Sequence, residues 1–228
     1  MKDQLKVIEE NVRTALALLQ IKDLISWLDK SGFFIAPAST NYHGNYQGGL
    51  IEHSWLVYDL LVKKQEYLGT TYTLENLITV GLLHDVCKLG MYEEDHDDAT
   101  EPQIFRLQKE CKKFKHGFPK KLNKQYASDL IQYYVGGAVG EYPEFKIGYK
   151  VNDQFPIGHG EKSVIMLLQH MPLEECEILA IRWHMGPFEP GVNFNFPTGY
   201  AYREAINKCP LATMLFTSDV EASNILEA

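Results

Sequence analysis

The chain has 228 residues, of which 45% are hydrophobic and 23% are charged, and its formal net charge is −8. Such a chain is an ordinary globular protein, long enough to bury a core without disulfide or metal braces. The charge excludes a surface that is basic throughout, as in a general nucleic-acid platform, although it is compatible with a local basic groove.

Helical periodicity dominates the first part of the chain. Apolar residues at helical spacing predict helices within 3–31, and a Gly-, Asn- and Tyr-rich stretch at 31–49 predicts a long loop over the surface or around a site. Further helices are predicted at about 50–64 and 74–88. Because charges interrupt the apolar positions of the first 19 residues, neither a signal peptide nor a membrane span is expected there.

The middle of the chain is polar and only weakly periodic. An acidic cluster at 92–103 and a run of six lysines at 112–124 predict solvated surface loops. As an alternative, the lysine run lies beside the active site and attracts a phosphorylated substrate. Residues 144–158 predict a β-hairpin around Val151-Asn152-Asp153.

Helices are predicted again at about 159–171, 173–185 and 210–226. The predicted fold class is therefore all-α, a helical bundle with a small β-hairpin insertion. Four cysteines lie far apart and form no CxxC pair, so we expect four reduced thiols in a cytoplasmic protein, at Cys87, Cys111, Cys176 and Cys209.

The strongest local signal for chemistry is the dyad His84-Asp85 near the end of the apolar run ENLITVGLLHDVCK. Burying an ionisable pair beside Leu82 and Val86 costs free energy unless the pair is satisfied, and metal ligation is one way to satisfy it. Because adjacent residues of a helix point about 100° apart, both reach one ion only if it lies between them, off the side of the helix. Alone, such a dyad is more often a hydrogen-bonded helix end.

Two further polar residues in apolar helical stretches strengthen the metal hypothesis. His53 lies on the preceding predicted helix, 31 residues before His84, a separation that suits two antiparallel helices and their connection. Asp219 lies within the late apolar helix ATMLFTSDVEASNIL. Together, two imidazoles and two carboxylates form a mixed nitrogen and oxygen set that favours Mn, Fe, Ni, Co or Zn over Mg or Ca.

The order H … HD … D on helices resembles the HD superfamily of metal-dependent phosphohydrolases. The contexts GGLIEHS around His53 and LLHDVCKLG around His84 and Asp85 look especially similar to HD domains of bacterial 3′–5′ exoribonucleases and related phage or bacterial hydrolases. The resemblance covers residues from about 43 to 222. It implies a single HD-type domain over 1–228, with N-terminal helices and a loop at 1–48 and the HD core at 49–222.

The same resemblance implies that His159 and His184 bind a second ion bridged by Asp85. Two ions about 3.5–4 Å apart would clamp a phosphoryl group and generate a hydroxide nucleophile. Alternatively, both histidines contact the substrate or cap helices. Dinuclear family members often have a paired His-His, and this chain departs from that pattern with Trp183-His184-Met185.

Several side chains near the predicted metal site are candidates for substrate binding. Lys88 matches the lysine of the family's HDxxK motif, which implies a catalytic role beside Asp85 in holding a phosphate oxygen and offsetting developing charge. The alternative is an exposed lysine at a helix end. Lys162 and Arg182 are further candidates of the same kind, and His43 is a candidate to line the pocket.

The predicted function is hydrolysis of a phosphomonoester or phosphodiester, on a nucleotide or a nucleic-acid end, with one or two divalent transition metal ions. A small phosphorylated substrate such as a free nucleotide or short oligonucleotide is favoured, because no RNA-binding motif is evident and the net charge is unfavourable for nucleic acid. Two alternatives remain open, a di-iron HD-type oxygenase and a ligand-binding or sensory module without turnover. No association with a membrane is expected.

Overall fold

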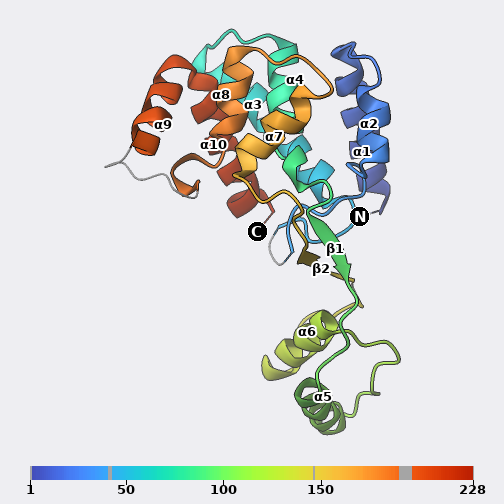
Figure 1. Cartoon of the computed structure of the whole chain (residues 1–228). Helices are drawn as coiled ribbons and strands as arrows, with labels where there is room; N and C mark the ends of the chain where they lie inside the picture. The colour runs from blue at the N-terminus through green and yellow to red at the C-terminus, as the bar shows by residue number, and fades with distance from the viewer. Residues whose placement is uncertain (1, 41–42, 146, 190–196, 228) are drawn as a thin grey trace. The chain divides into compact units, whose positions relative to one another are not determined.

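A computed structural model describes residues 2–40, 43–145, 147–189 and 197–227 (Figure 1). The described residues are mostly helical with one small two-stranded sheet, which confirms the predicted fold class. The chain forms two compact units, one made of residues 1–92 and 152–228 and the other of residues 93–151. The expected organisation as one domain with its core at 49–222 stays a prediction. Asn41 and Tyr42 of the expected loop at 31–49 lie outside the described residues.

The first unit is a helical bundle around a large hydrophobic core. Its fully buried residues include Leu50, Leu82 and Leu215, which come from three different helices. Helix α4 packs on α3, and α10 packs on both α3 and α8. The elements of this unit are α1 (Lys2–Leu18), α2 (Leu24–Lys30), α3 (Gly49–Leu68), α4 (Leu74–Leu83), the 3-10 turn η1 (Val86–Lys88), α7 (His159–Leu168), α8 (Glu175–Arg182), the 3-10 turn η2 (Gly186–Phe188), α9 (Pro197–Lys208), α10 (Pro210–Glu221) and the π-helical turn η3 (Ala222–Leu226).

Helix α4 is the central buried element of this bundle. It starts in a capping box, in which the Thr73 side chain accepts from the Asn76 backbone and the Asn76 side chain accepts from the Thr73 backbone. Gly81 lets α3 approach closely, because a Cβ atom at this position would lie 2.8 Å from Cα of Tyr58. The close contact of α3 with α4 brings the end of α4 beside the middle of α3.

The described residues of the second unit form two helices for which the sequence predicted no element. Helix α5 (Glu101–Phe114) and helix α6 (Lys124–Val135) pack through Leu107, Leu130 and Tyr134 into a small separate core. The predicted loops at 92–103 and 112–124 overlap α5 only at its two ends. Residues 92–95 form a strand instead, and residues 115–123 are a mostly exposed loop as predicted. The helix itself was not predicted because lysines dilute its apolar periodicity, although Leu107 and Cys111 keep helical spacing. The lysines themselves are exposed, as expected.

The small sheet pairs two strands that are distant in sequence. Strand β2 (Gly148–Val151) pairs with β1 (Tyr92–Asp95), and α5 and α6 lie between them in the chain. Lys150 of β2 lies 3.4 Å from the Glu93 carboxylate of β1. The hairpin predicted within 144–158 is therefore wrong in its second strand, because residues 92–95 supply the strand that pairs with β2. Lys146 lies outside the described residues.

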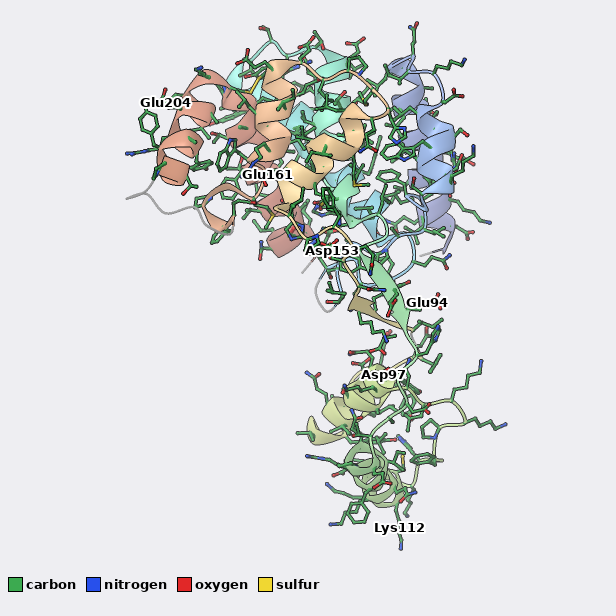
Figure 2. The ribbon with its side chains drawn as sticks, in the orientation of Figure 1. Glu94, Asp97, Lys112, Asp153, Glu161 and Glu204 are labelled. Atoms are coloured by element: carbon green, nitrogen blue, oxygen red, sulfur yellow. A yellow bond between two sulfur atoms is a disulfide. The ribbon has the colours of Figure 1, made fainter. Side chains whose placement is uncertain are left out.

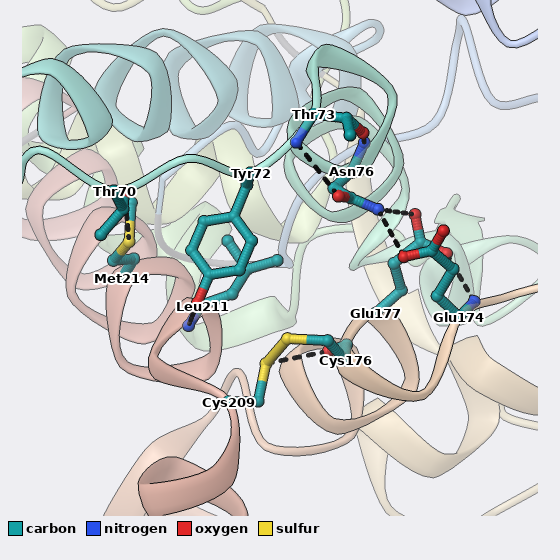
Figure 3. Close-up of a disulfide and its surroundings, with 10 residues drawn as sticks. All are labelled: Thr70, Tyr72, Thr73, Asn76, Glu174, Cys176, Glu177, Cys209, Leu211 and Met214. Atoms are coloured by element: carbon teal, nitrogen blue, oxygen red, sulfur yellow. Dashed lines mark hydrogen bonds between the residues drawn. A yellow bond between two sulfur atoms is a disulfide. The ribbon is translucent and has the colours of Figure 1, made fainter.

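A disulfide joins α8 to the residue that precedes α10. The sulfur atoms of Cys176 and Cys209 lie 2.04 Å apart, and the Cα atoms 5.5 Å apart (Figure 3). The expectation of four reduced cysteines is thus wrong for this pair, while Cys87 and Cys111 are free and buried. Sequence spacing gave no sign of the bond, because the packing of α10 on α8 brings the two cysteines together.

Among the described residues, none of the helices combines the length and the apolar character needed to cross a membrane.

Candidate metal centre

Helix α3 supplies His53 from its buried face. The side chain is fully enclosed, beside the equally buried Leu50 and Val57. Its Nε2 atom lies 3.2 Å from Oδ1 of Asp219 on α10 and 3.8 Å from Oδ2 of Asp85. The packing of α10 on α3 therefore places an imidazole and a carboxylate from opposite ends of the chain in contact.

His84 and Asp85 lie where α4 ends. The helix stops at Leu83, and Asp85 has φ −108° and ψ 20°, in the bridge region rather than the helical one. Both side chains face the same point, with Nε2 of His84 3.5 Å from Oδ2 of Asp85. The helix predicted over 74–88 was thus wrong at its end, and this break removes the divergence of about 100° that a continuous helix would impose.

His184 joins this group from the turn that follows α8. Its side chain is fully buried, and its Nε2 atom lies 3.4 Å from Oδ1 of Asp85. Its ring centroid is 5.1 Å from that of His84. The carboxylate of Asp85 therefore faces three imidazoles, which come from α3, from the end of α4 and from the end of α8.

The histidines direct their Nε2 atoms toward the carboxylate of Asp85, and their Nδ1 atoms form hydrogen bonds with groups outside this cluster. Nδ1 of His84 lies 3.0 Å from the Gly81 carbonyl, and Nδ1 of His184 lies 2.7 Å from the Ile181 carbonyl. A carbonyl oxygen only accepts, so each Nδ1 donates its proton and Nε2 of the neutral ring keeps a lone pair. The Nε2 atoms of His53, His84 and His184 are all buried without a well-formed hydrogen bond.

This donor set fits a metal cation. Three imidazole Nε2 atoms and the carboxylates of Asp85 and Asp219 converge in one buried space, where a bound metal ion would take the place of a proton on His53 as the compensating positive charge. The ligand atoms of His53, His84 and Asp219 all lie within 4.8 Å of one another. Mixed nitrogen and oxygen ligands of this kind suit divalent transition metals.

Burial and nearby charges set the protonation states. Burial lowers the pKa of His84 to about 4, so its ring is neutral near pH 7. Burial opposes ionisation of Asp85, but Lys88 and the neighbouring histidines outweigh it and hold its pKa well below the usual range. Burial also opposes charge on His53, but contacts with Asp219 and Glu227 raise its pKa to about 9. At neutral pH a metal ion therefore competes with a proton for His53.

Lys88 lies against the predicted ligand Asp85. Its ammonium nitrogen is 2.6 Å from Oδ2 of Asp85, and its side chain is only 11% exposed. Burial alone would lower the pKa of Lys88, but the carboxylate of Asp85 raises it above its usual value, so the side chain stays charged. This geometry differs from that of an exposed lysine at a helix end.

His159 lies outside this group of ligand atoms. It begins α7, and its Nδ1 atom lies 3.7 Å from Sγ of Cys87, which is itself 3.8 Å from Oδ1 of Asp85. Among the described residues, the groups of three possible metal ligands are His53 with His84 and Asp219, and His53 with His43 and Glu227. These groups of described residues include none of Asp85, His159 and His184. Its predicted role as a ligand of a second ion therefore stays a prediction, without a direct contact to Asp85 in support.

The two other predicted substrate-binding cations are engaged in ion pairs. Lys162 lies 2.5 Å from Asp153, and Arg182 lies 2.7 Å from Glu161 (Figure 2 labels both carboxylates). Arg182 also stacks over the ring of Trp183, with its guanidinium carbon 4.1 Å from the ring centroid. Each cation keeps further N–H donors beside its carboxylate partner.

Glu227 contacts the site although the sequence gave no reason to select it. Its Oε2 atom lies 3.0 Å from Nδ1 of His53, and its Oε1 atom is buried without a hydrogen-bond partner. The predicted lining residue His43 lies on the same side, with its ring centroid 4.9 Å from that of His53. Glu227 directly follows the last predicted helix, and only the tertiary structure reveals its contact with His53.

Comparison with known proteins gives one partial match. Over 70 residues the chain is 37% identical to a dihydroneopterin 2′,3′-cyclic phosphate phosphodiesterase of Methanocaldococcus jannaschii. The match covers 29% of this chain and 28% of the relative's own length. No family model matches the chain, and no solved structure matches it.

Proposed function

We propose that this protein is a metal-dependent phosphohydrolase of the HD type that cleaves phosphate esters. The observation that supports this proposal most is the convergence of three buried Nε2 atoms on the carboxylate of Asp85, with Asp219 beside them. The partial relative, named as a cyclic phosphate phosphodiesterase, favours a phosphodiester as the bond that is cleaved.

His53, His84, Asp85 and Asp219 would hold the ion, with His184 as a further ligand. A divalent Mn, Fe, Ni, Co or Zn ion bound there would lower the pKa of a water molecule and polarise a phosphoryl oxygen. The chain contributes orientation, because the carbonyl partners of His84 and His184 fix which ring nitrogen is free. The proposal includes a second ion at His159, and measuring the number of metal ions bound per protein chain would test it.

Lys88 would contact the phosphate of the substrate while it stays paired with the carboxylate of Asp85. Its ammonium group holds Asp85 in place at 2.6 Å and retains two further protons for donation. A phosphate oxygen beside this group would gain a charge-assisted hydrogen bond that strengthens as negative charge develops in the transition state. Lys88 and Asp85 are therefore the proposed catalytic residues.

The test is metal-dependent turnover of a panel of esters. Protein stripped of metal is reloaded with Mn, Fe, Ni, Co or Zn and assayed on 2′,3′-cyclic nucleotides, nucleoside monophosphates and short RNA. Asp85→Asn should abolish turnover and weaken metal binding. The matched control is Asp59→Asn, which changes an exposed carboxylate on the same helix as His53.

Wild-type turnover in Asp85→Asn would overturn this mechanism. Metal binding without hydrolysis of any ester would shift the assignment to the other two hypotheses. Oxygen consumption by iron-loaded protein would then indicate the di-iron oxygenase, and tight ligand binding without turnover would indicate the sensory module.

A further inference from the structure

A cavity of about 450 Å³ adjoins the candidate metal centre. His184 and Asp219 form part of its wall, so the cavity is continuous with the proposed ligand set. Its volume falls within the range of small-molecule sites, about 300–1,000 Å³. Met185, Phe188, Phe216 and Asn224 form much of the remaining wall.

Aromatic side chains distinguish this cavity from the polar centre beside it. Phe188 is 72% exposed, so its ring is accessible to a ligand in the cavity that it lines. Its ring centroid lies 6.2 Å from that of Phe216, and the two planes are inclined at 45°. Both rings therefore present apolar surface to the space beside His184 and Asp219.

The backbone of η2 supports this aromatic wall. Gly186 has φ +56°, a conformation that L side chains rarely adopt, and a Cβ atom there would lie 2.6 Å from Cδ2 of Phe216. The glycine thus lets the turn that presents Phe188 lie directly against the ring of Phe216.

The charge of the lining indicates which part of a substrate enters. Neither lysine nor arginine contributes to the described wall, which includes the carboxylate of Asp219. Away from the metal centre, this wall offers a phosphate group no cationic partner, whereas a neutral planar ring needs none. The side-chain amide nitrogen of Asn224 donates a hydrogen bond to the Val220 carbonyl at 3.0 Å. This bond leaves the amide oxygen of Asn224 to accept from a ring N–H group.

We propose that this cavity binds the planar aromatic ring of the substrate, a nucleobase or a similar heterocycle, while its phosphate lies at the metal centre. The inference rests on the proposed phosphohydrolase function and adds the place where the ring of the substrate binds. Phe188 and Phe216 would stack on the ring and so favour substrates that have one. Stacking on aromatic side chains accepts any planar base.

The first experiment compares two cyclic phosphodiesters that differ in the ring. Phe188→Ala should raise KM for a 2′,3′-cyclic nucleotide about tenfold, the scale of one lost base stack. It should leave kcat/KM for glycerol 1,2-cyclic phosphate, which has no ring, unchanged. Phe188→Tyr should restore the low KM, and Phe105→Ala, which removes a similarly exposed phenylalanine on α5, should have no effect.

The second experiment needs no turnover. Fluorescence of 2-aminopurine riboside should be quenched by metal-free wild-type protein and not by Phe188→Ala. Equal losses on both diesters, or quenching that survives in Phe188→Ala, would overturn the ring site. If no ester is hydrolysed but quenching depends on Phe188, the proposed hydrolase function fails and the ring site stands.

Discussion

At the scale of single residues, the candidate centre depends on which histidine nitrogen carries the proton. His84 and His184 use backbone carbonyls three residues earlier in the chain for this purpose. His53 uses a carboxylate instead, and Glu227 supplies it from the far end of the chain. A hydrogen bond from Nδ1 of a ligand to a carboxylate orients the ring and makes Nε2 a stronger donor to a metal.

We therefore expect Glu227 to position His53. Glu227→Ala should weaken metal binding about 10- to 100-fold, because His53 loses the partner that fixes its ring. Glu227→Gln should have a smaller effect, since its amide oxygen still accepts the hydrogen bond. Isothermal titration of metal-free protein with Mn or Zn measures both variants.

The control for this titration is Glu204→Gln, which changes an exposed glutamate on α9 (labelled in Figure 2). An unchanged metal affinity in Glu227→Ala would show that the contact with His53 has no positioning role.

At the scale of elements, the distance between α3 and α4 decides whether His53 and His84 meet. Gly81 is the point of closest approach, because an added Cβ atom would lie 2.8 Å from the Cα atom and 2.9 Å from the Cβ atom of Tyr58. Backbone atoms cannot move aside as the tip of a flexible side chain can. The close approach of α3 requires glycine at this helix position despite its low helix propensity.

Gly81→Ala should therefore destabilise the protein, although alanine is the better helix former. Overpacking of this kind costs about 1–3 kcal/mol of unfolding free energy, which urea denaturation monitored by circular dichroism would measure. Gly117→Ala is the matched control, since no atom lies within 4 Å of its added Cβ. Equal stability of the two variants would contradict close packing of α3 on α4.

The disulfide acts at the same scale, because it joins α8 to the start of α10. Replacing both Cys176 and Cys209 with serine should lower the unfolding free energy by roughly 3–4 kcal/mol, from the closure entropy of a loop of this length. Their separation in sequence is 33 residues. The measurement is urea denaturation of the double variant beside Cys111→Ser, which changes a free buried cysteine. A double variant as stable as wild type would argue against a bond in the folded protein.

At the scale of the whole molecule, charge is unevenly distributed along the chain. Between Arg106 and Lys124 there are eight basic residues and one acidic residue, whereas acidic residues outnumber basic ones about twofold in the rest. The described basic side chains of this segment are exposed, and the ion pair recorded among them joins Lys113 to Glu110 at 3.9 Å. The attraction of a phosphorylated substrate by these lysines stays a prediction.

Charge reversal would test that prediction. Changing Lys112, Lys115 and Lys120 to glutamate should lower kcat/KM for a short oligonucleotide roughly tenfold at low salt, because long-range attraction speeds association. The difference should shrink in high salt, where screening is strong.

The matched control for charge reversal makes the same change at three exposed lysines of the first unit, Lys6, Lys22 and Lys30. Equal losses in the two triple variants would indicate an effect of net charge rather than of this segment.

The sequence by itself determined the helical class of the fold. It also identified polar residues whose predicted burial requires a compensating partner. His53, His84, Asp85 and Asp219 interrupt apolar helical stretches, and local periodicity is enough to identify such interruptions. Periodicity also placed His184 at the end of a helix. Only the structure distinguishes the two further histidines, because His184 lies beside Asp85 whereas His159 lies against Cys87.

Tertiary structure alone decided the features that join residues distant in the chain. Glu227 meets His53 across 174 positions, Cys176 meets Cys209 across 33, and β2 finds its partner in β1 rather than in its own neighbourhood. Periodicity and capping report only on residues within a few turns of one another. Contacts at long range depend on how whole helices pack, and that packing is set by the summed shape of the core rather than by any one motif.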